Sequence, residues 1–324
     1  MVISFKTRDA IGKTNARHHR HYTTQAQIGP REEGENMFPT NISNYARPTS
    51  VDEALAAIKE YPDGDGIFIA GGQSLMQAIK SRIVRPEAIV DLQDVAELRG
   101  ITIGDTVSIK PMTRYVEIAE STALPNGLLA LRDAASHVGD RQVRNRGTIG
   151  GSLCWNYVAS CLPCVALGLD ASLHLKSASG AARVLSADDF LLGPLETDRE
   201  EDEILVDIHF ENVAQSGSAY KKWGLVTDSL PVVGVCASVT RDGDTCTQAR
   251  LSFSGLTNGA ERCMEAEALL KGKPFNQDSI SAALSAAAEN METQSDQWAD
   301  ASYRERLMHT LGETVLNLAW QRAG

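Results

Sequence analysis

GTIGGSL, residues 147–153, is a stretch in which side chains are almost absent, and AGGQSL, residues 70–75, has a similar design. A pair of glycines after a strand lets the backbone turn with φ > 0 and points several N–H groups outward. Such a concavity binds anions, phosphates above all. A helix that follows the loop adds a partial positive charge at its N-terminus. We therefore treat both as candidate phosphate-binding loops, the first loop (70–75) and the second loop (147–153).

Two such loops suit a ligand with a long phosphate bridge, such as a dinucleotide. Ser74 and Ser152 follow the glycines, where a hydroxyl can donate one more hydrogen bond, and Arg141, Arg144 and Arg146 add positive charge before the second loop. Neither loop matches the G-x-G-x-x-G of a Rossmann fold or the G-x-x-x-x-G-K-[ST] of a P-loop. The residues alone leave two interpretations open: a dinucleotide site in an unusual fold, or two ordinary turns.

The composition is that of an acidic globular protein with 324 residues, 43% of them hydrophobic, and a formal net charge of −11. This length suggests two or three domains with buried cores. The longest apolar run, residues 230–239, is about half of the roughly 20 residues that span a bilayer, so we expect a buried strand and no membrane span. The acidic charge argues against nucleic-acid binding. The six cysteines are irregularly spaced, and we expect free thiols and a cytoplasmic location.

The N-terminal segment differs from the rest of the chain. Residues 1–36 contain His18, His19 and His21 but few large apolar residues and no hydrophobic period. The segment lacks the apolar core of a signal peptide. We expect a disordered extension or a misplaced start codon, and metal binding by the histidines is a less favoured alternative.

From Met37 the pattern predicts alternating helices and strands to about residue 170. The stretch SVDEALAAIKE begins with Ser50 and has Glu53 three residues later, the signature of a capping box before an amphipathic helix. A short buried strand, GIFIAGG, leads into the first loop. The other elements expected here are a helix at 74–82, a strand at 87–92, a strand, turn and helix within 106–121, and helices at 126–139 and 162–170.

The second half of the chain predicts strands followed by helices. We expect strands at 171–177, 181–190, 202–210, 219–225, 231–240 and 248–256, and helices at 259–272, 279–290 and 301–320. The last three strands and the three helices can form an α+β layer with its own core. The polar stretch ENVAQSGSA, residues 211–219, marks the expected domain boundary.

Five motifs in order resemble one known family. RPTSVDEAL, AGGQSLMQAIKSRIVRPEAIVDL, VRNRGTIGGSL, LPVVGVCASV and ASYRERLMHTL together resemble the FAD-binding middle subunit of molybdenum hydroxylases, the group of the carbon monoxide dehydrogenase medium chain and the flavin part of xanthine dehydrogenase. The resemblance covers about residues 38–322. It implies an α+β fold with two domains. These are an FAD-binding domain of the vanillyl-alcohol oxidase (PCMH) type at 37–213, with subdomains at about 37–97 and 98–213, and a C-terminal domain at 214–324 with a three-stranded sheet and a helical bundle.

The resemblance also implies which residues contact the cofactor. Both loops would hold the pyrophosphate of FAD. By motif position the FAD contacts would be Ala70, Gly71, Gly72, Gln73 and Ser74 in the first loop, Thr148, Ile149, Gly150, Gly151 and Ser152 in the second loop, and Cys161, Leu205 and Lys221 beyond them.

The sequence departs from the family pattern after the second loop. Many relatives have GGSLAHADPAADLP where this chain has GGSLCWNYVASCLP, residues 150–163. Cys161 replaces an Asp that contacts FAD in relatives, and Tyr157 and Val158 replace an earlier Asp-Pro. We expect either weaker or altered flavin binding, or a pocket repacked around a small thiol.

Cys154, Cys161 and Cys164 also raise the question of a metal site. The 4-hydroxybenzoyl-CoA reductase branch of the family carries an additional iron–sulfur cluster on four cysteines within an insertion. This chain has three neighbouring cysteines and no insertion, so we favour buried thiols and expect no metal. Trp155 and Tyr157 either stack on the flavin or pack against protein.

No acid, base or nucleophile is assigned, because a flavin carries the redox chemistry itself. His137 either contacts a phosphate or is structural. The resemblance implies two protein partners, a large subunit with the molybdenum cofactor and a small subunit with two [2Fe–2S] clusters. The large subunit would oxidise a substrate with oxygen from water. Electrons would pass through the clusters to FAD and on to NAD, oxygen or another acceptor.

Two alternatives stay open at this point. One is a flavin-free scaffold subunit, because of the changes at Tyr157 and Cys161. The other is a stand-alone oxidase of the vanillyl-alcohol type, for which the C-terminal domain looks too small.

Overall fold

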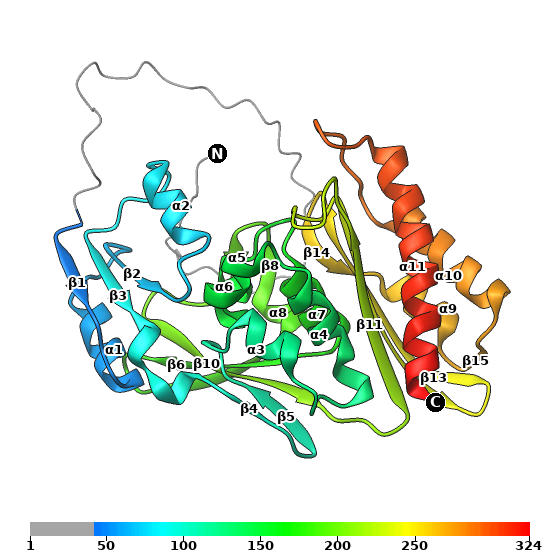
Figure 1. Cartoon of the computed structure of the whole chain (residues 1–324), viewed down its shortest axis with the longest axis horizontal. Coiled ribbons are helices and arrows are strands. Elements are labelled where there is room, and N and C mark those ends of the chain that lie inside the picture. The colour runs from blue at the N-terminus through cyan, green and yellow to red at the C-terminus, as the bar shows by residue number, and fades with distance from the viewer. Residues whose placement is uncertain (1–41) are drawn as a thin grey trace, which may run out of the picture.

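The computed structural model describes residues 42–324 (Figure 1). The extension expected at 1–36 lies outside the described residues. None of the helices within 42–324 has both the length and the apolar character that crossing a membrane requires.

The first layer is a parallel three-stranded sheet with the order β1-β3-β2. Its elements are β1 (Asn44–Ala46), α1 (Val51–Lys59), β2 (Gly66–Ile69), α2 (Leu75–Lys80) and β3 (Ala88–Asp91). Half of the predicted capping box is present: the Ser50 side chain accepts a hydrogen bond from the Glu53 backbone N–H at 3.2 Å, whereas the Glu53 carboxylate accepts from the backbone N–H of Thr49 at 2.8 Å. The buried face of α1 carries Val51, Ala54, Leu55 and Ile58, the spacing of an amphipathic helix. The first loop connects β2 to α2.

The second layer is a five-stranded antiparallel sheet with the order β4-β5-β10-β6-β7. Its strands are β4 (Ile101–Thr102), β5 (Thr106–Ile109), β6 (Ser172–Ser177), β7 (Ala182–Ser186) and β10 (Glu203–Glu211). Helices lie against one face of it (Figure 1). They are α3 (Tyr115–Glu120), α4 (Leu129–Ser136), α5 (Arg141–Arg146), α6 (Ile149–Trp155), α7 (Cys161–Gly168) and α8 (Ala187–Phe190), and a short pair, β8 (Leu191–Gly193) and β9 (Glu196–Thr197), lies nearby.

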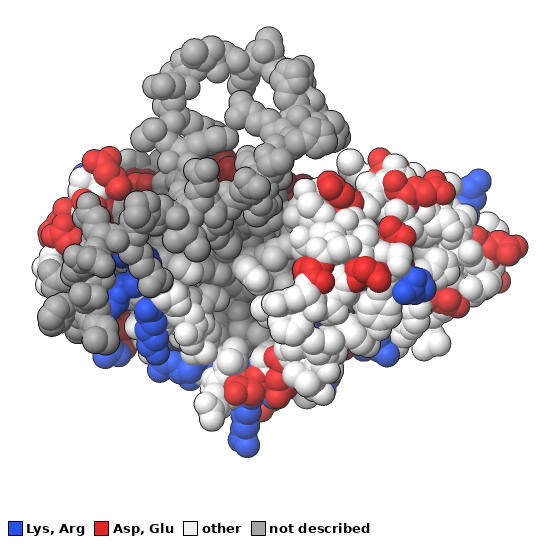
Figure 2. Space-filling view, turned by 90° about the horizontal axis from the view of Figure 1, so that it is seen from above, with Lys and Arg blue, Asp and Glu red and all other residues white. Residues whose placement is uncertain are grey.

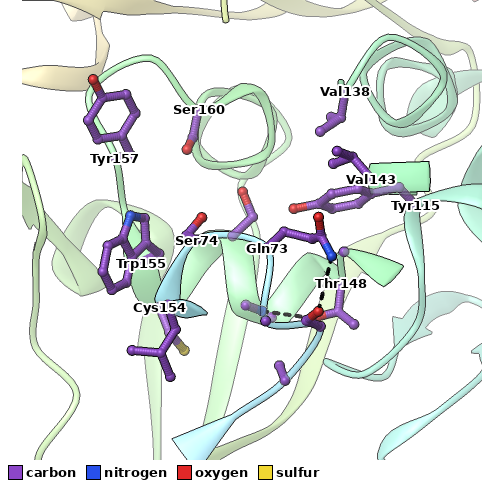
Figure 3. Close-up of a pocket in the computed structure, with 18 of the residues that line it drawn as sticks. Gln73, Ser74, Tyr115, Val138, Val143, Thr148, Cys154, Trp155, Tyr157 and Ser160 are labelled. Carbon is purple, nitrogen blue, oxygen red and sulfur yellow. Dashed lines mark hydrogen bonds between the residues drawn. The ribbon is translucent and has the colours of Figure 1, made fainter. Parts of the chain in front are cut away.

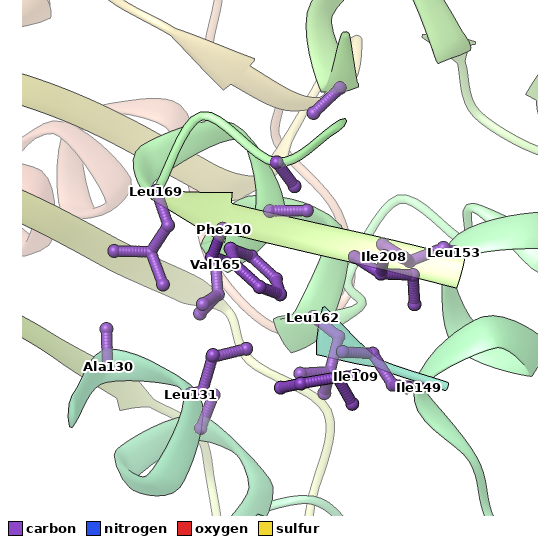
Figure 4. Packing of buried hydrophobic residues seen from close by; sticks show 14 of the residues in the cluster. Ile109, Ala130, Leu131, Ile149, Leu153, Leu162, Val165, Leu169, Ile208 and Phe210 are labelled. Atoms are coloured by element: carbon purple, nitrogen blue, oxygen red, sulfur yellow. The ribbon is translucent and has the colours of Figure 1, made fainter. Parts of the chain in front are cut away.

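The core of this layer forms where strand and helix side chains meet. Ile109, Ile208 and Phe210 from the sheet pack with Leu131 and Leu162 from the helices (Figure 4). All five are at most 1% exposed. The strands of the two layers lie within 44–91 and 101–211, the ranges in which two α+β subdomains are expected from the sequence.

The three strands predicted for the C-terminal part are present, and they are the long strands of its sheet. These are β11 (Ser216–Trp223), β12 (Val233–Asp242) and β13 (Thr245–Leu256), all antiparallel, and β14 (Gly259–Arg262) and β15 (Lys273–Pro274) extend the sheet. Three helices pack on the sheet, namely α9 (Met264–Leu270), α10 (Gln277–Asn290) and α11 (Ala301–Ala323). On the face seen from above, Asp and Glu side chains are spread over this part of the molecule (Figure 2).

Two secondary-structure predictions were wrong in part. The strand expected at 181–190 ends at Ser186, and the residues after it form helix α8 (Ala187–Phe190). The single helix expected at 259–272 is strand β14 followed by the shorter helix α9. Gly259 adopts φ +91°, which turns the chain back so that β14 pairs with β13. A tight glycine turn thus overrides the helix propensity of the residues that follow.

The C-terminal helix closes onto the second layer. The Arg322 guanidinium on α11 forms an ion pair with Asp133 on α4 at 2.6 Å. Asp133 also accepts from the backbone N–H of Tyr220 on β11, at 3.1 Å. This half-buried carboxylate joins α4, β11 and α11, and it sets the position of β11 relative to α4.

Candidate functional site

A cavity of about 730 Å³ lies among the three sheets. Phe68 on β2, Leu205 on β10 and Lys222 on β11 each contribute to its wall, as do both glycine loops. The volume falls within the roughly 300–1,000 Å³ of typical cofactor sites. Trp155 and Tyr157 lie on one side of the cavity and Tyr115 on the other (Figure 3).

The first loop presents unpaired backbone donors to this cavity. Within residues 42–324, the N–H groups of Gly71, Gly72, Gln73 and Ser74 donate no hydrogen bond. Gly72 has φ +73°, so the left-handed conformation predicted for a glycine pair is confirmed there. Ser74 occupies the N-cap position of α2, but its side chain makes no capping hydrogen bond. The loop therefore offers a row of four free donors and a serine hydroxyl.

The second loop has its amides already paired. Ile149 N–H donates to the Thr113 carbonyl at 3.1 Å, and Gly150 N–H donates to the Pro111 carbonyl at 2.9 Å. Gly151 N–H donates to the hydroxyl of Thr148, the N-cap of α6, at 3.1 Å (Figure 3). The prediction of an outward-facing loop with φ > 0 is wrong here. The glycines form the first turn of a helix with negative φ.

Glycine is required at two of these positions by the protein itself. A Cβ on Gly71 would overlap the carbonyl oxygen of Arg146 and lie 2.8 Å from its carbonyl carbon. A Cβ on Gly150 would overlap the Pro111 side chain and lie 2.8 Å from the Pro111 carbonyl oxygen. The two loops thus touch each other and the β5–α3 connection through backbone atoms, an approach that only glycine permits.

Gly151 differs from those two glycines. A Cβ there would meet only the Thr148 hydroxyl at 2.9 Å and the Ala70 Cβ at 3.5 Å, and Gly151 itself lines the cavity. The second loop therefore contributes a smooth glycine surface beside the first loop.

Most of the sequence-predicted contacts meet at this cavity. Its wall includes Ala70, Gly71, Gly72, Gln73, Ser74, Thr148, Gly150, Gly151, Ser152, Cys161 and Leu205. Ile149 and Lys221 are not part of the wall. Ile149 is 1% exposed and packs in the core of the second layer.

The lysine prediction misses the cavity by one residue. Successive side chains of a strand point to opposite faces. Lys221 is exposed on the outer face of β11, whereas Lys222 lines the cavity and donates to the Ser229 carbonyl at 2.5 Å. Burial lowers the pKa of Lys222, and the neighbouring Cys161 partly opposes this shift.

Several wall residues were not predicted. Tyr115 follows the β5–α3 connection, and burial raises its pKa to about 12, so the phenol stays neutral. Arg199 also lines the cavity, and its guanidinium donates to the Glu203 carbonyl at 2.9 Å. No local pattern marks either residue, since both reach the cavity only through the packing of distant elements.

The structure also places the cysteine, aromatic and histidine residues whose roles the sequence left open. Cys154, Trp155 and Tyr157 line the cavity. His137 does not, and its ring lies at the end of α4 with Nδ1 2.7 Å from the Asp133 carbonyl oxygen. Among the described residues, no group of three His, Cys, Asp or Glu side chains could hold a metal ion.

The arrangement fits a dinucleotide better than a metal or a small anion. The free donors of the first loop and the glycine surface of the second suit a phosphate bridge. The aromatic and apolar walls suit planar rings at either end. The fit depends on the open row of amides at 71–74, which no protein acceptor among residues 42–324 satisfies.

Comparison with known proteins gives concordant results. Residues 39–210 match the model of the FAD binding domain in molybdopterin dehydrogenase, and residues 218–318 match the CO dehydrogenase flavoprotein C-terminal domain. The carbon monoxide dehydrogenase medium chain of Hydrogenophaga pseudoflava is 33% identical over 88% of this chain and 99% of its own length. The nicotine 6-hydroxylase medium subunit of Paenarthrobacter nicotinovorans is 30% identical over 82% of this chain and 93% of its own.

A solved structure agrees with these matches. The carbon monoxide dehydrogenase of Hydrogenophaga pseudoflava that lacks the Mo-pyranopterin moiety of its cofactor contains a chain that superposes with a TM-score of 0.84 at 33% identity. The match covers 89% of this chain and 100% of the other.

Proposed function

The chain belongs to the family of FAD-binding medium subunits of molybdenum hydroxylases, with FAD as its cofactor, and from this premise we propose that it is the electron-transfer subunit of a heterotrimeric enzyme. In this role it passes electrons from [2Fe–2S] clusters through FAD to an external acceptor. The partners are a large molybdenum subunit and a small iron–sulfur subunit. The names of two relatives, a medium subunit and a subunit of a dehydrogenase complex, support such an assembly.

We propose that FAD occupies the cavity with its pyrophosphate on the first loop. The free N–H groups of Gly71 to Ser74 support this assignment, since a pyrophosphate supplies the acceptors that these donors lack. Gly151, beside the first loop, leaves room for the ligand because no side chain projects from it into the cavity. Thr148 and Ser152 complete the phosphate side, whereas Ile149 acts by filling the core beneath it.

In this proposal Leu205, Cys161 and Lys222, which line the same cavity, would contact the redox-active part of the cofactor. Bound FAD supplies the two-electron chemistry, and the chain orients it and sets its electrostatics. We assign to Lys222 the cofactor contact that was expected from the sequence for Lys221. Its amino group is half-buried in the cavity wall, and its positive charge would stabilise negative charge that develops on the ring.

We propose a domain boundary between residues 213 and 214, in the connection from β10 to β11. The two family matches end at 210 and begin at 218, which supports this division. The cavity is then shared between the FAD-binding domain and the C-terminal domain, because Lys222 and residues 228–231 come from the latter.

The proposed role is tested with the full chain and its partners. A tagged chain co-expressed with the neighbouring reading frames should retain a flavin spectrum and co-purify with one iron–sulfur protein and one molybdenum protein. Reducing the iron–sulfur protein should then bleach the flavin absorbance. A colourless chain that cannot be reconstituted would favour the scaffold alternative. Substrate oxidation by the yellow chain alone would favour the stand-alone oxidase.

A further inference from the structure

Two thiols sit in the first turn of α7 at the wall of the cavity. Cys161 is the first residue of this helix and Cys164 is the fourth, with Pro163 between them, which is a C-x-x-C spacing. Residues three apart lie on the same helix face with Cβ atoms about 5–6 Å apart. A disulfide needs Cβ atoms about 3.5–4.5 Å apart, so a small tightening of this turn brings the sulfurs within bonding distance.

We propose that Cys161 and Cys164 form a redox-active dithiol that exchanges two electrons with the FAD bound in the cavity. On oxidation both S–H bonds break and one S–S bond forms. The two electrons and two protons released reduce FAD to its two-electron-reduced form, and the reverse reaction restores the dithiol. The inference rests on the proposed placement of FAD.

The two thiols differ in their access to the ligand. Cys161 lines the cavity and is 4% exposed, whereas Cys164 is fully buried behind it. In a redox-active dithiol one sulfur reacts with the partner molecule and the other sulfur closes the disulfide. Cys161 and Cys164 are placed for these two roles. Cys154 also lines the cavity but lies on α6, outside this spacing.

Two buried hydroxyl groups beside the thiols have no acceptor. The Tyr220 phenol and the Ser254 hydroxyl make no hydrogen bond with any described residue. They flank Gly234, where an added Cβ would lie 2.5 Å from the Tyr220 oxygen and 2.6 Å from Ser254 Oγ. Tyr220 neighbours both thiols and Ser254 neighbours Cys164. Unpaired donors next to sulfur stabilise a thiolate, the form that reacts.

A positive charge is also close to the first thiol. Burial raises the pKa of Cys161, and it raises that of Cys164 to about 12, so both thiols are neutral at rest. The Lys222 amine shares the cavity wall, and its charge favours the Cys161 thiolate.

The electron capacity of the full chain with bound FAD tests the proposal. The protein is oxidised with ferricyanide, desalted and titrated anaerobically with dithionite while the flavin absorbance is followed. We expect wild type to take up four electrons per FAD and Cys164→Ser to take up two. Cys236→Ser is the matched control, because Cys236 is a buried thiol outside both the C-x-x-C spacing and the cavity wall, and it should still take up four.

Peptide mapping of wild type gives a second readout that needs no variant. After alkylation under denaturing conditions, the peptide with Cys161 and Cys164 should carry a disulfide in the oxidised protein and two alkyl groups in the reduced protein. A yellow wild type that takes up two electrons and shows both thiols alkylated in each state overturns the inference alone. A drop to two electrons in Cys236→Ser also overturns it. A colourless chain overturns the placement of FAD as well.

Discussion

The first and second glycine loops have nearly the same letters and opposite roles. Among the described residues, 42–324, AGGQSL leaves its amides at 71–74 without a protein partner, and TIGGSL gives three of its amides to Thr113, Pro111 and Thr148. The first loop is therefore the one able to bind a phosphate through its backbone. The second loop packs against the first through backbone atoms, and at Gly151 it keeps the adjoining cavity wall clear of side chains.

This difference shows that a glycine pair does not by itself indicate ligand contact. Gly71 and Gly150 are glycines because other backbone atoms approach them, Gly72 because of its positive φ, and Gly151 because of the cavity. The same Gly-Gly pattern in the two loops thus has three different reasons at four positions. Substitution of each glycine by alanine should distinguish these reasons.

The largest effect is expected for Gly71→Ala. Its Cβ would overlap the Arg146 carbonyl, which is backbone and cannot rotate away. We expect the free energy of unfolding of the apoprotein to fall by about 3 kcal/mol or more, the upper range for overpacking. Chemical denaturation measures it. Gly193→Ala, where a Cβ meets nothing within 4 Å, is the control and should change stability little. Equal stability of the two variants would contradict the contact between the loops.

Gly150→Ala should act in the same way but less strongly. Its Cβ would overlap the Pro111 side chain and approach the Pro111 carbonyl, and the ring can shift slightly. We expect a loss of about 2 kcal/mol in the apoprotein, measured by the same denaturation. A variant with wild-type stability but no bound flavin would instead show that this glycine is needed for contact with the ligand.

Gly151→Ala should spare the fold and impair the cofactor. The added Cβ displaces the capping hydroxyl of Thr148, which costs about 1 kcal/mol, while alanine in place of glycine in a helix returns about the same amount. We expect unchanged stability of the apoprotein and an FAD affinity at least about tenfold weaker, or about 1.4 kcal/mol. Titration of the apoprotein with FAD measures it, and normal affinity would return the second loop to a purely structural role.

The smallest effects are expected when the hydroxyl group of Thr148 or of Ser74 is removed. Thr148→Ala should lower the stability of the apoprotein by about 1 kcal/mol, because Thr148 caps α6. Ser74→Ala should leave stability almost unchanged, because Ser74 makes no capping bond, and it should weaken FAD binding modestly. Thermal unfolding with and without FAD distinguishes the two. A reversed pattern would exchange the roles that we assign to the loops.

The sequence predicted much of the fold because the relevant signals are local. The cap at Ser50, the strand before the first loop and the three long C-terminal strands all follow from hydrogen bonds and burial patterns within a few residues. The strand–helix break at 259–272 was missed because one positive φ at Gly259 outweighs helix propensity. Lys222 was missed because the face of a strand changes with every residue.

What the sequence by itself determined is the family, the cofactor class and the presence of two glycine loops. Only the tertiary structure decided which loop has free donors. The amides of Ile149 and Gly150 are paired with carbonyls of Thr113 and Pro111, more than thirty residues earlier in the chain. A backbone N–H is the same group in both loops, and it can bind a ligand only where folding brings no carbonyl or hydroxyl within reach.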